Sequence, residues 1–216
     1  GAMGNRSSPP ARSITMPHTS DRTPNRRVLA IWCARLAIDR WRLSEGLAPG
    51  EGADAAPLAL ITETAHGPRI AAANDAGLEA GAQPGMMLAD ARTLCPEIAT
   101  APSDPAGDLA FLEQLAIWAQ RWGPWSALDA PDGLLVDVTS VPHLFGGEKR
   151  LLDDVHAAFS RRSISLRAAI APTAGSAWAL AHYGPPGAIV DCHDDIERAL
   201  ASLPVAALRL DQDVLT

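Results

Sequence analysis

The chain of 216 residues is 47% hydrophobic and 20% charged, which is typical of a globular protein with one sizeable domain or a domain carrying an insertion. No run of about 18 apolar residues occurs, which excludes a transmembrane helix, and no membrane partner is expected. Residues 1–27 carry a charge of +4 (five Arg, one Asp) and residues 28–216 carry −11 (13 basic, 24 acidic), which excludes a strong stand-alone nucleic-acid binder because phosphate contacts dominate such affinity.

Residues 1–25 are predicted to be disordered. The first four resemble the remnant of a removed tag, and the rest are rich in Ser, Pro, Thr and Arg. They hold too few apolar side chains for a core, and they lack the apolar segment of a secretory signal.

The next part of the chain predicts short strands and helices separated by loops. Residues 28–33 form an apolar run that predicts a buried strand. Further on, the pattern of apolar residues, Gly and Pro predicts a helix over 36–43, a flexible loop over 45–57, strands over 57–63 and 69–73, a turn over 81–85 and a helix over 87–94.

The rest of the chain begins with a well-marked helix. Asp104 is a typical capping residue, Pro105 suits a first helical turn, and apolar residues then recur at helical spacing. Pro131, Asp132 and Gly133 form a strong turn signal that predicts a β-hairpin, with Gly133 at a positive φ. The elements predicted around this turn are strands over 125–128 and 134–138, a helix over 148–159, a strand over 165–171, a helix over 173–182, a strand over 188–192 and a helix over 195–203.

Without residues 37–104, the order of the elements is strand, helix, hairpin, helix, strand, helix. This order is close to a split βαβ arrangement, which predicts an α+β fold: a ferredoxin-like antiparallel sheet with helices on one face. Residues 37–104 are then an insertion after the first strand.

No metal ion or other cofactor is predicted. Cys33, Cys95 and Cys192 are odd in number, far apart and outside any Cys-x-x-Cys pair, and the six histidines lack metal-binding spacing. Cysteines of this kind indicate core residues of a protein in a reduced, cytoplasmic compartment.

Three stretches stand out by their order and spacing: AGAQPGMMLADARTLCPE at residues 80–97, APDGLLVDVT at 130–139 and AIAPTAGSAWALA at 169–181. Together they resemble the fingers and palm of Y-family translesion DNA polymerases, above all the ImuB-like branch, over about residues 26–210. The resemblance implies a palm over 26–36 and 105–192, a fingers-like insertion over 37–104, and the start of a truncated thumb over 193–216.

Members of that family hold two magnesium ions, which need carboxylate ligands. The family carboxylate at the end of the first strand matches Trp32, whose indole has no metal-binding atom. The Asp–Glu pair of the hairpin matches Asp132 and Gly133, or Asp129 and Ala130 in a shifted alignment. Either alignment keeps one carboxylate of the pair, which makes a poor magnesium site.

The positions that contact the triphosphate in the family are also altered. Its fingers Tyr and Arg match Asp75 and Leu78, and its Lys at a helix start matches Ala174. Its ribose-excluding aromatic residue matches Leu36 or Ala37. Phosphate oxygens would therefore meet an acid and apolar side chains.

Two further features indicate residual contacts. Arg161, Arg162 and Arg167 form the basic cluster of the folded part, which predicts either a solvated helix end or a contact with DNA or a partner. Thr173 is predicted to cap the helix that follows it, which would keep a weak anion site.

These substitutions predict a catalytically inactive scaffold subunit of a bacterial damage-induced mutagenesis complex. The resemblance implies three protein partners, bound mostly through regions beyond this segment: a RecA-like ImuA subunit, an error-prone replicative-type polymerase and a sliding clamp. DNA binding by this segment is expected to be weak at most. Two alternatives stay open: an active Y-family polymerase with displaced acids at Asp129, Asp132 and Asp137, and another palm-fold nucleotide enzyme related to nucleotide cyclases.

Overall fold

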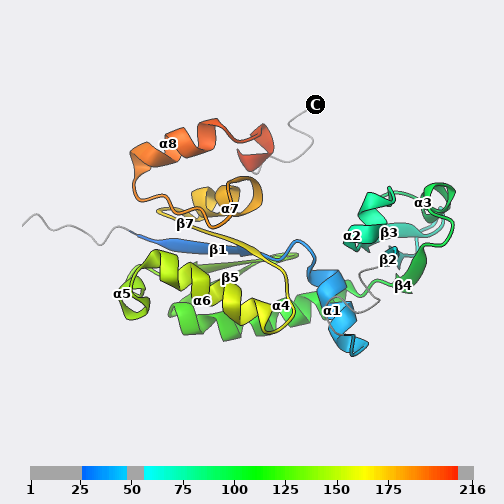
Figure 1. Ribbon diagram of the computed structural model, residues 1–216, viewed down its shortest axis with the longest axis horizontal. Helices are drawn as coiled ribbons and strands as arrows, with labels where there is room; N and C mark the ends of the chain where they lie inside the picture. Colours follow the sequence, from blue (N-terminus) through cyan, green and yellow to red (C-terminus); the bar gives the residue numbers. More distant parts are fainter. Residues whose placement is uncertain (1–25, 48–55, 209–216) are drawn as a thin grey trace, which may run out of the picture.

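Figure 1 shows the computed structural model, which describes residues 26–47 and 56–208. Two sheets organise the chain, one with four strands and one with three. The predicted disordered tail of residues 1–25, most of the predicted loop over 45–57, and residues 209–216 lie outside the described residues. Among the described helices, none combines the length and the apolar character that a membrane crossing requires.

The four-stranded sheet is antiparallel throughout. Its strands are β1 (Val28–Trp32), β5 (Trp125–Asp129), β6 (Gly133–Asp137) and β7 (Arg167–Ala171), in the order β5-β6-β1-β7. The predicted hairpin is confirmed as β5 and β6. The first strand lies between the hairpin and the last strand, which is the ferredoxin-like order expected of the predicted α+β fold.

Two long helices cover one face of this sheet (Figure 1). They are α4 (Pro105–Ala119), followed by the short η1 (Gln120–Trp122), and α6 (Glu148–Ser160), preceded by the short α5 (Pro142–Phe145). Asp104 caps α4 as predicted, since its side chain accepts a hydrogen bond from the Gly107 N–H at 2.9 Å. Leu29 and Ile31 of β1 are buried in the core beneath these helices.

Helices cover the other face of the sheet as well, whereas the predicted arrangement had helices on one face. These elements are α7 (Ala174–Tyr183), α8 (His193–Ala201) and η2 (Val205–Leu208). Val28 and Ala30 of β1 share a second core with Leu180 and Ile196. Since β1 is buried on both faces, its sequence is a continuous apolar run and not an alternating one.

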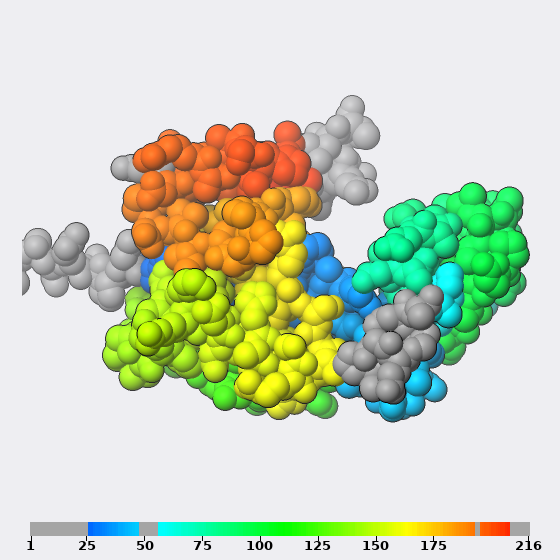
Figure 2. Space-filling model, viewed as in Figure 1, coloured from blue at the N-terminus to red at the C-terminus, as the bar shows by residue number. Residues whose placement is uncertain are grey.

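The three-stranded sheet lies within the 37–104 insertion and has the order β3-β2-β4. The elements of this part are α1 (Leu36–Ser44), β2 (Leu58–Thr62), β3 (Arg69–Ala73), α2 (Asp75–Glu79), α3 (Leu88–Leu94) and β4 (Ala99–Pro102). Ile70, Leu88 and Ile98 belong to a separate core here. In Figure 2 the three-stranded sheet with α2 and α3 forms a lobe set off by a notch from the rest of the molecule, whereas α1 is tied to α4 by the ion pair of Arg40 with Asp108. The strand β4 and the helix α2 were not predicted, because both are short and β4 pairs in parallel with a distant strand.

The strand predicted over 188–192 is wrong. The chain makes an isolated bridge there, between Ile189 and Ile170 of β7. The Ile170 N–H donates to the Ala188 carbonyl and the Val190 N–H donates to the Ile170 carbonyl, each at 3.0 Å. Helix α8 begins directly afterwards, so too few residues remain to extend the pairing.

Candidate functional site

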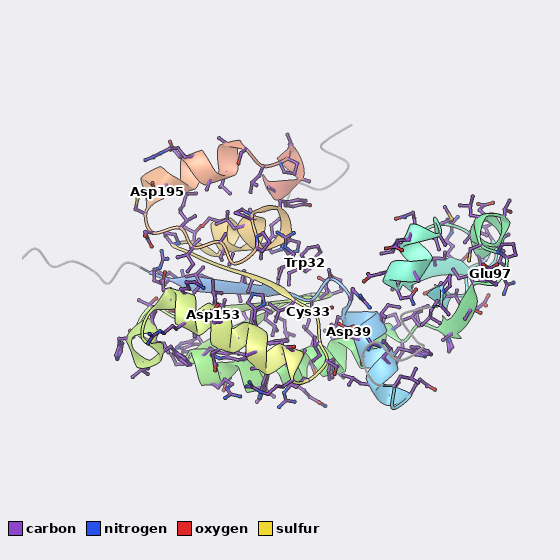
Figure 3. The ribbon with its side chains drawn as sticks, viewed as in Figure 1. Trp32, Cys33, Asp39, Glu97, Asp153 and Asp195 are labelled. Carbon is purple, nitrogen blue, oxygen red and sulfur yellow. The ribbon has the colours of Figure 1, made fainter. Side chains whose placement is uncertain are left out.

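The end of β1 lies beside the turn of the β5–β6 hairpin. In the β1–β6 ladder Trp32 is opposite Gly133, and Asp132 precedes Gly133 in the turn. The backbone N–H of Cys33 donates to the carbonyl oxygen of Asp132 at 2.8 Å. The structure therefore brings together the three residues that the sequence assigned to one site, and Figure 3 labels Trp32 and Cys33 at this end of β1.

The Trp32 indole is hydrogen-bonded to the Asp132 carboxylate. Its Nε1 donates to Oδ2 of Asp132 at 3.1 Å. Burial is the main cause that raises the pKa of Asp132, and the negative charge of Asp129 raises it further. The Trp32 hydrogen bond and nearby His182 partly oppose this rise in pKa. Asp132 is therefore a half-buried acceptor whose charged form is disfavoured.

Aromatic rings stack behind Trp32. The centroid of the His182 ring lies 4.2 Å from that of Trp32 and 4.0 Å from that of Trp178. Trp178 and His182 are one turn apart on α7, and Nδ1 of His182 lies 2.9 Å from the Trp178 carbonyl oxygen. This stack was not predicted. The four-residue spacing was the available signal, but nothing local connected it to Trp32.

The side chains of this site do not fit a magnesium ion of the kind that Y-family polymerases hold. Trp32 offers one N–H donor and no ligand atom, and Gly133 has no side chain. Asp137 lies at the other end of β6, four residues from Gly133, which corresponds to roughly 13 Å. Asp129 and Asp132 alone leave most of an octahedral oxygen shell unfilled.

Position 133 requires a glycine because Asp129 lies very close to its backbone. The predicted positive φ is wrong, because Gly133 begins β6 and is not among the described residues with positive φ. A Cβ atom at this position would lie 2.9 Å from the Asp129 carbonyl oxygen and 3.0 Å from Oδ2 of Asp129. Any side chain here must displace Asp129, and an acidic one would also meet its negative charge.

A hollow of about 380 Å³ lies between the hairpin turn and the three-stranded sheet. Leu36 and Ala37, which match the family's ribose-excluding aromatic, both line it. Asp108 and Asp132 line it too, whereas no Arg or Lys does within the described part of the chain. Asp108 is paired with Arg40 at 2.5 Å, between Oδ1 and Nε. The lining thus offers no cation directly to a triphosphate, which is a polyanion.

The sequence of this chain matches a known family. Residues 52–182, more than half of the chain, match the model of the impB/mucB/samB family. The chain belongs to that family. Two curated relatives are each called Protein ImuB, from Caulobacter vibrioides strain NA1000 / CB15N and strain ATCC 19089 / CIP 103742 / CB 15. Each is 48% identical over 130 residues, which is 60% of this chain and only 28% of the relative's length.

Solved structures of Y-family polymerases share the fold. The insertion ternary complex of Dbh DNA polymerase has a TM-score of 0.69 at 16% identity, covering 84% of this chain and 53% of that chain. The crystal structure of DinB from Sulfolobus solfataricus has a TM-score of 0.66 at 17% identity, covering 88% of this chain and 58% of that chain. The chain is thus an ImuB-like homologue of Y-family polymerases with their palm-and-fingers fold.

In this impB/mucB/samB member, the positions matched to phosphate-contacting residues make structural contacts. Oδ2 of Asp75 accepts a hydrogen bond from Nη1 of Arg35 at 2.5 Å, which ties α2 to the segment before α1. Leu78 packs against the core of the three-stranded sheet. Ala174 packs against the second core of the four-stranded sheet. These three side chains therefore support the fold of the family without a group that binds phosphate.

Thr173 caps α7, as predicted. Its hydroxyl accepts a hydrogen bond from the Ser176 N–H at 3.1 Å, and the Ser176 hydroxyl accepts one from the Thr173 N–H at 3.3 Å. This reciprocal capping box occupies two of the N–H groups that a bound anion would use.

The three arginines predicted to cluster lie on different sides of the four-stranded sheet. Arg161 ends α6, and Cζ of Arg162 lies 4.1 Å from the centroid of the Trp118 ring on the α4–α6 face. Arg167, on β7, donates instead to the Gly184 carbonyl at the end of α7. The prediction of a single basic cluster is therefore wrong, because the sheet separates Arg167 from Arg161 and Arg162. Their contact with DNA or a partner stays a prediction.

Proposed function

We propose that this chain is a catalytically inactive, polymerase-like scaffold subunit of a bacterial damage-induced mutagenesis complex. The observation that supports this most is the hydrogen bond between Trp32 and Asp132. Where the family carries a metal-binding carboxylate, an indole donates its N–H to the hairpin carboxylate that remains. Because the Trp32 indole donates a proton and cannot coordinate a metal, this pair of side chains favours a hydrogen bond over a bound magnesium ion.

The charges around the hollow support the proposal that this chain does not bind a nucleotide substrate. Two acids line the hollow beside the hairpin, and its lining within the described residues includes no basic side chain. Asp75, at a position where the family contacts phosphate, is paired with Arg35. A nucleoside triphosphate bound there would lose hydration without gaining charge-assisted hydrogen bonds.

A scaffold acts through other proteins, so the proposal extends to partners. We expect a RecA-like ImuA subunit, an error-prone replicative-type polymerase and a sliding clamp, with the replicative-type polymerase performing the synthesis. The support is the 48% identity to two proteins called ImuB. The chain spans 28% of their length, and we expect most of the contacts to involve regions outside this segment.

Primer extension tests the absence of catalysis. With a labelled primer-template, all four nucleotides and either magnesium or manganese, we expect no extension. The double variant Trp32→Asp, Gly133→Glu should not restore activity, because metal and phosphate ligands act as a unit. Template-dependent extension that Asp132→Ala abolishes would overturn the proposal.

A cellular assay separates scaffold from enzyme. In cells whose induced mutagenesis depends on this protein, Asp132→Asn should leave the mutation frequency after DNA damage unchanged, whereas deletion of the gene should abolish the induction. Asn keeps an oxygen that accepts the Trp32 N–H. Loss of induced mutagenesis with Asp132→Asn, at an unchanged protein level, would point to catalysis.

One observation favours a second candidate, an active polymerase with displaced acids. Asp129 is opposite Gly133 in the β5–β6 ladder, so it flanks the turn that holds Asp132, and its negative charge contributes to the raised pKa of Asp132. Neighbouring carboxylates can share a divalent cation. Calorimetric titration with manganese decides between the candidates: binding that is lost in both Asp129→Asn and Asp132→Asn would support the enzyme, and no binding would support the scaffold.

A further inference from the structure

Two arginine side chains flank Trp118 of α4. Cζ of Arg162 lies 4.1 Å from the centroid of the Trp118 ring, and Cζ of Arg121 lies 5.6 Å from the same centroid. Beneath them the Trp118 ring meets Trp122 at 4.9 Å and Phe159 at 5.2 Å, both edge-on. A guanidinium stacked on an anchored indole is held in a defined place.

The arginines of this region carry no ion pair. Arg121, Arg161 and Arg162 are all exposed, and no carboxylate of the described residues lies within ion-pair distance of them. Other arginines of the same sheet and its insertion behave differently, since Arg27 pairs with Glu148 and Arg40 with Asp108. Two of these cations, Arg121 and Arg162, lie over the same Trp118 ring, in a chain whose residues 28–216 carry a net charge of −11.

Apolar surface adjoins these charges. Ile117 of α4 is 69% exposed and lies four residues before Arg121, which belongs to η1 directly after α4. We call this set the Trp118 surface: Ile117, Trp118, Arg121 and Arg162. It lies on the face of the sheet opposite Trp32, which packs against the α7 side. Binding of a partner to the Trp118 surface is therefore independent of whether the hairpin site is catalytic.

We propose that the Trp118 surface binds an acidic segment of a partner polypeptide. Carboxylates of the partner pair with Arg121 and Arg162, and an apolar side chain packs on Ile117 and the edge of Trp118. Arginine forms two parallel hydrogen bonds to a carboxylate, and stacking on Trp118 lowers the entropy lost on binding. A nucleic acid fits less well, because its affinity needs many phosphate contacts and the folded part repels it through its net charge.

A fluorescein-labelled peptide in which glutamates alternate with leucines is the probe. Binding to the full chain is followed by fluorescence anisotropy, and the indole N–H signal of Trp118 is followed by NMR. The double variant Arg121→Gln, Arg162→Gln should weaken binding by about tenfold, since charge-assisted hydrogen bonds are lost while Trp118 stays in place. The matched control Arg92→Gln, Lys149→Gln changes the net charge equally at exposed sites elsewhere and should change affinity by less than about twofold.

Selective loss of peptide binding in the first variant, together with a shift of the Trp118 signal, supports the proposal. Equal loss in both variants means non-specific attraction and overturns it. Equal binding of a peptide with glutamines in place of glutamates overturns it as well, because the arginines would then contribute nothing. Displacement of the peptide by a single-stranded or duplex DNA oligonucleotide at a lower concentration assigns the surface to nucleic acid. Thermal melts of both variants establish that they fold.

Discussion

Trp32 and Asp132 are joined across the end of the β1–β6 ladder by a hydrogen bond of 3.1 Å from the indole Nε1 to Oδ2. The two residues are 100 positions apart in the chain. Their bond gives Asp132 a structural role, since the carboxylate positions the Trp32 ring against His182. Asp132 is thus a hydrogen-bond acceptor that joins the hairpin turn to the end of β1.

The first prediction concerns Asp132 and pH. Burial raises the pKa of Asp132, so the folded state favours its protonated form. This contribution to stability is complete below the pKa of the unfolded chain and is lost as pH rises through the folded-state pKa. Asp132→Asn removes the titration but keeps an acceptor for Trp32. The melting temperature of the variant relative to the parent should therefore increase between about pH 3 and pH 7.

Asp137→Asn is the control of opposite sign. The Thr139 hydroxyl donates a hydrogen bond to Asp137, which lowers the pKa of this carboxyl. Its stabilising effect is present above the pKa of the unfolded chain and is lost as pH falls through the folded-state pKa. The variant should therefore melt below the parent at neutral pH and approach it in acid. Parallel pH profiles for the two variants would contradict the assignment of Asp132.

The second prediction separates two glycines. Gly133→Ala should lower the free energy of unfolding by roughly 1–3 kcal/mol, because a Cβ would lie 2.9 Å from the Asp129 carbonyl oxygen. Gly175→Ala, in α7 with nothing within 4 Å of the added Cβ, should raise it by about 0.5–1 kcal/mol through helix propensity. Urea unfolding measures both. A Gly133→Ala protein as stable as the parent would show that the hairpin can open without cost.

The third prediction concerns the cap of α7. Thr173→Ala removes the hydroxyl that accepts from the Ser176 N–H, which should cost about 1 kcal/mol of stability. Thr93→Ala, within α3, removes an exposed hydroxyl that bonds to a carbonyl of its own helix and should change stability by less than about 0.5 kcal/mol. Chemical unfolding of both variants measures the difference. Equal costs would argue against a specific capping role.

The fourth prediction concerns duplex DNA. The folded part is strongly acidic, so the chain should bind with a Kd of roughly 10⁻⁴ to 10⁻⁶ M at physiological salt. Arg22 and Arg26 of the N-terminal region are expected to supply much of any binding at low salt. Arg27, expected from the sequence to join them, is not available, since it is buried and its guanidinium binds Glu148 at 2.5 and 2.7 Å.

Fluorescence anisotropy at two salt concentrations, with and without residues 1–25, measures this affinity. Removal of that segment should weaken low-salt binding, because three of the five N-terminal arginines are lost with it. Submicromolar, salt-resistant binding by the shortened chain would make the sheet itself a DNA-binding surface and would contradict the prediction.

The sequence by itself determined the elements whose signals are local. Asp104 and Pro105 begin α4, Thr173 caps α7, and the turn through Asp132 joins two strands, all as predicted. Each depends on a few neighbouring residues, whose capping and turn preferences act over one helical turn or less. The sequence alone likewise shows that position 32 carries a tryptophan and not a carboxylate.

Only the tertiary structure decided the contacts between distant segments. The second helical layer, the parallel pairing of β4 with β2 and the stack of His182 on Trp32 have no local signal. The sequence predicts a positive φ at Gly133, whereas the structure shows that the close approach of Asp129 is what requires a glycine. Both situations select glycine, so residue identity alone does not distinguish them. The arginines at 161, 162 and 167 are neighbours in sequence, yet the sheet divides them, since successive elements bury opposite faces.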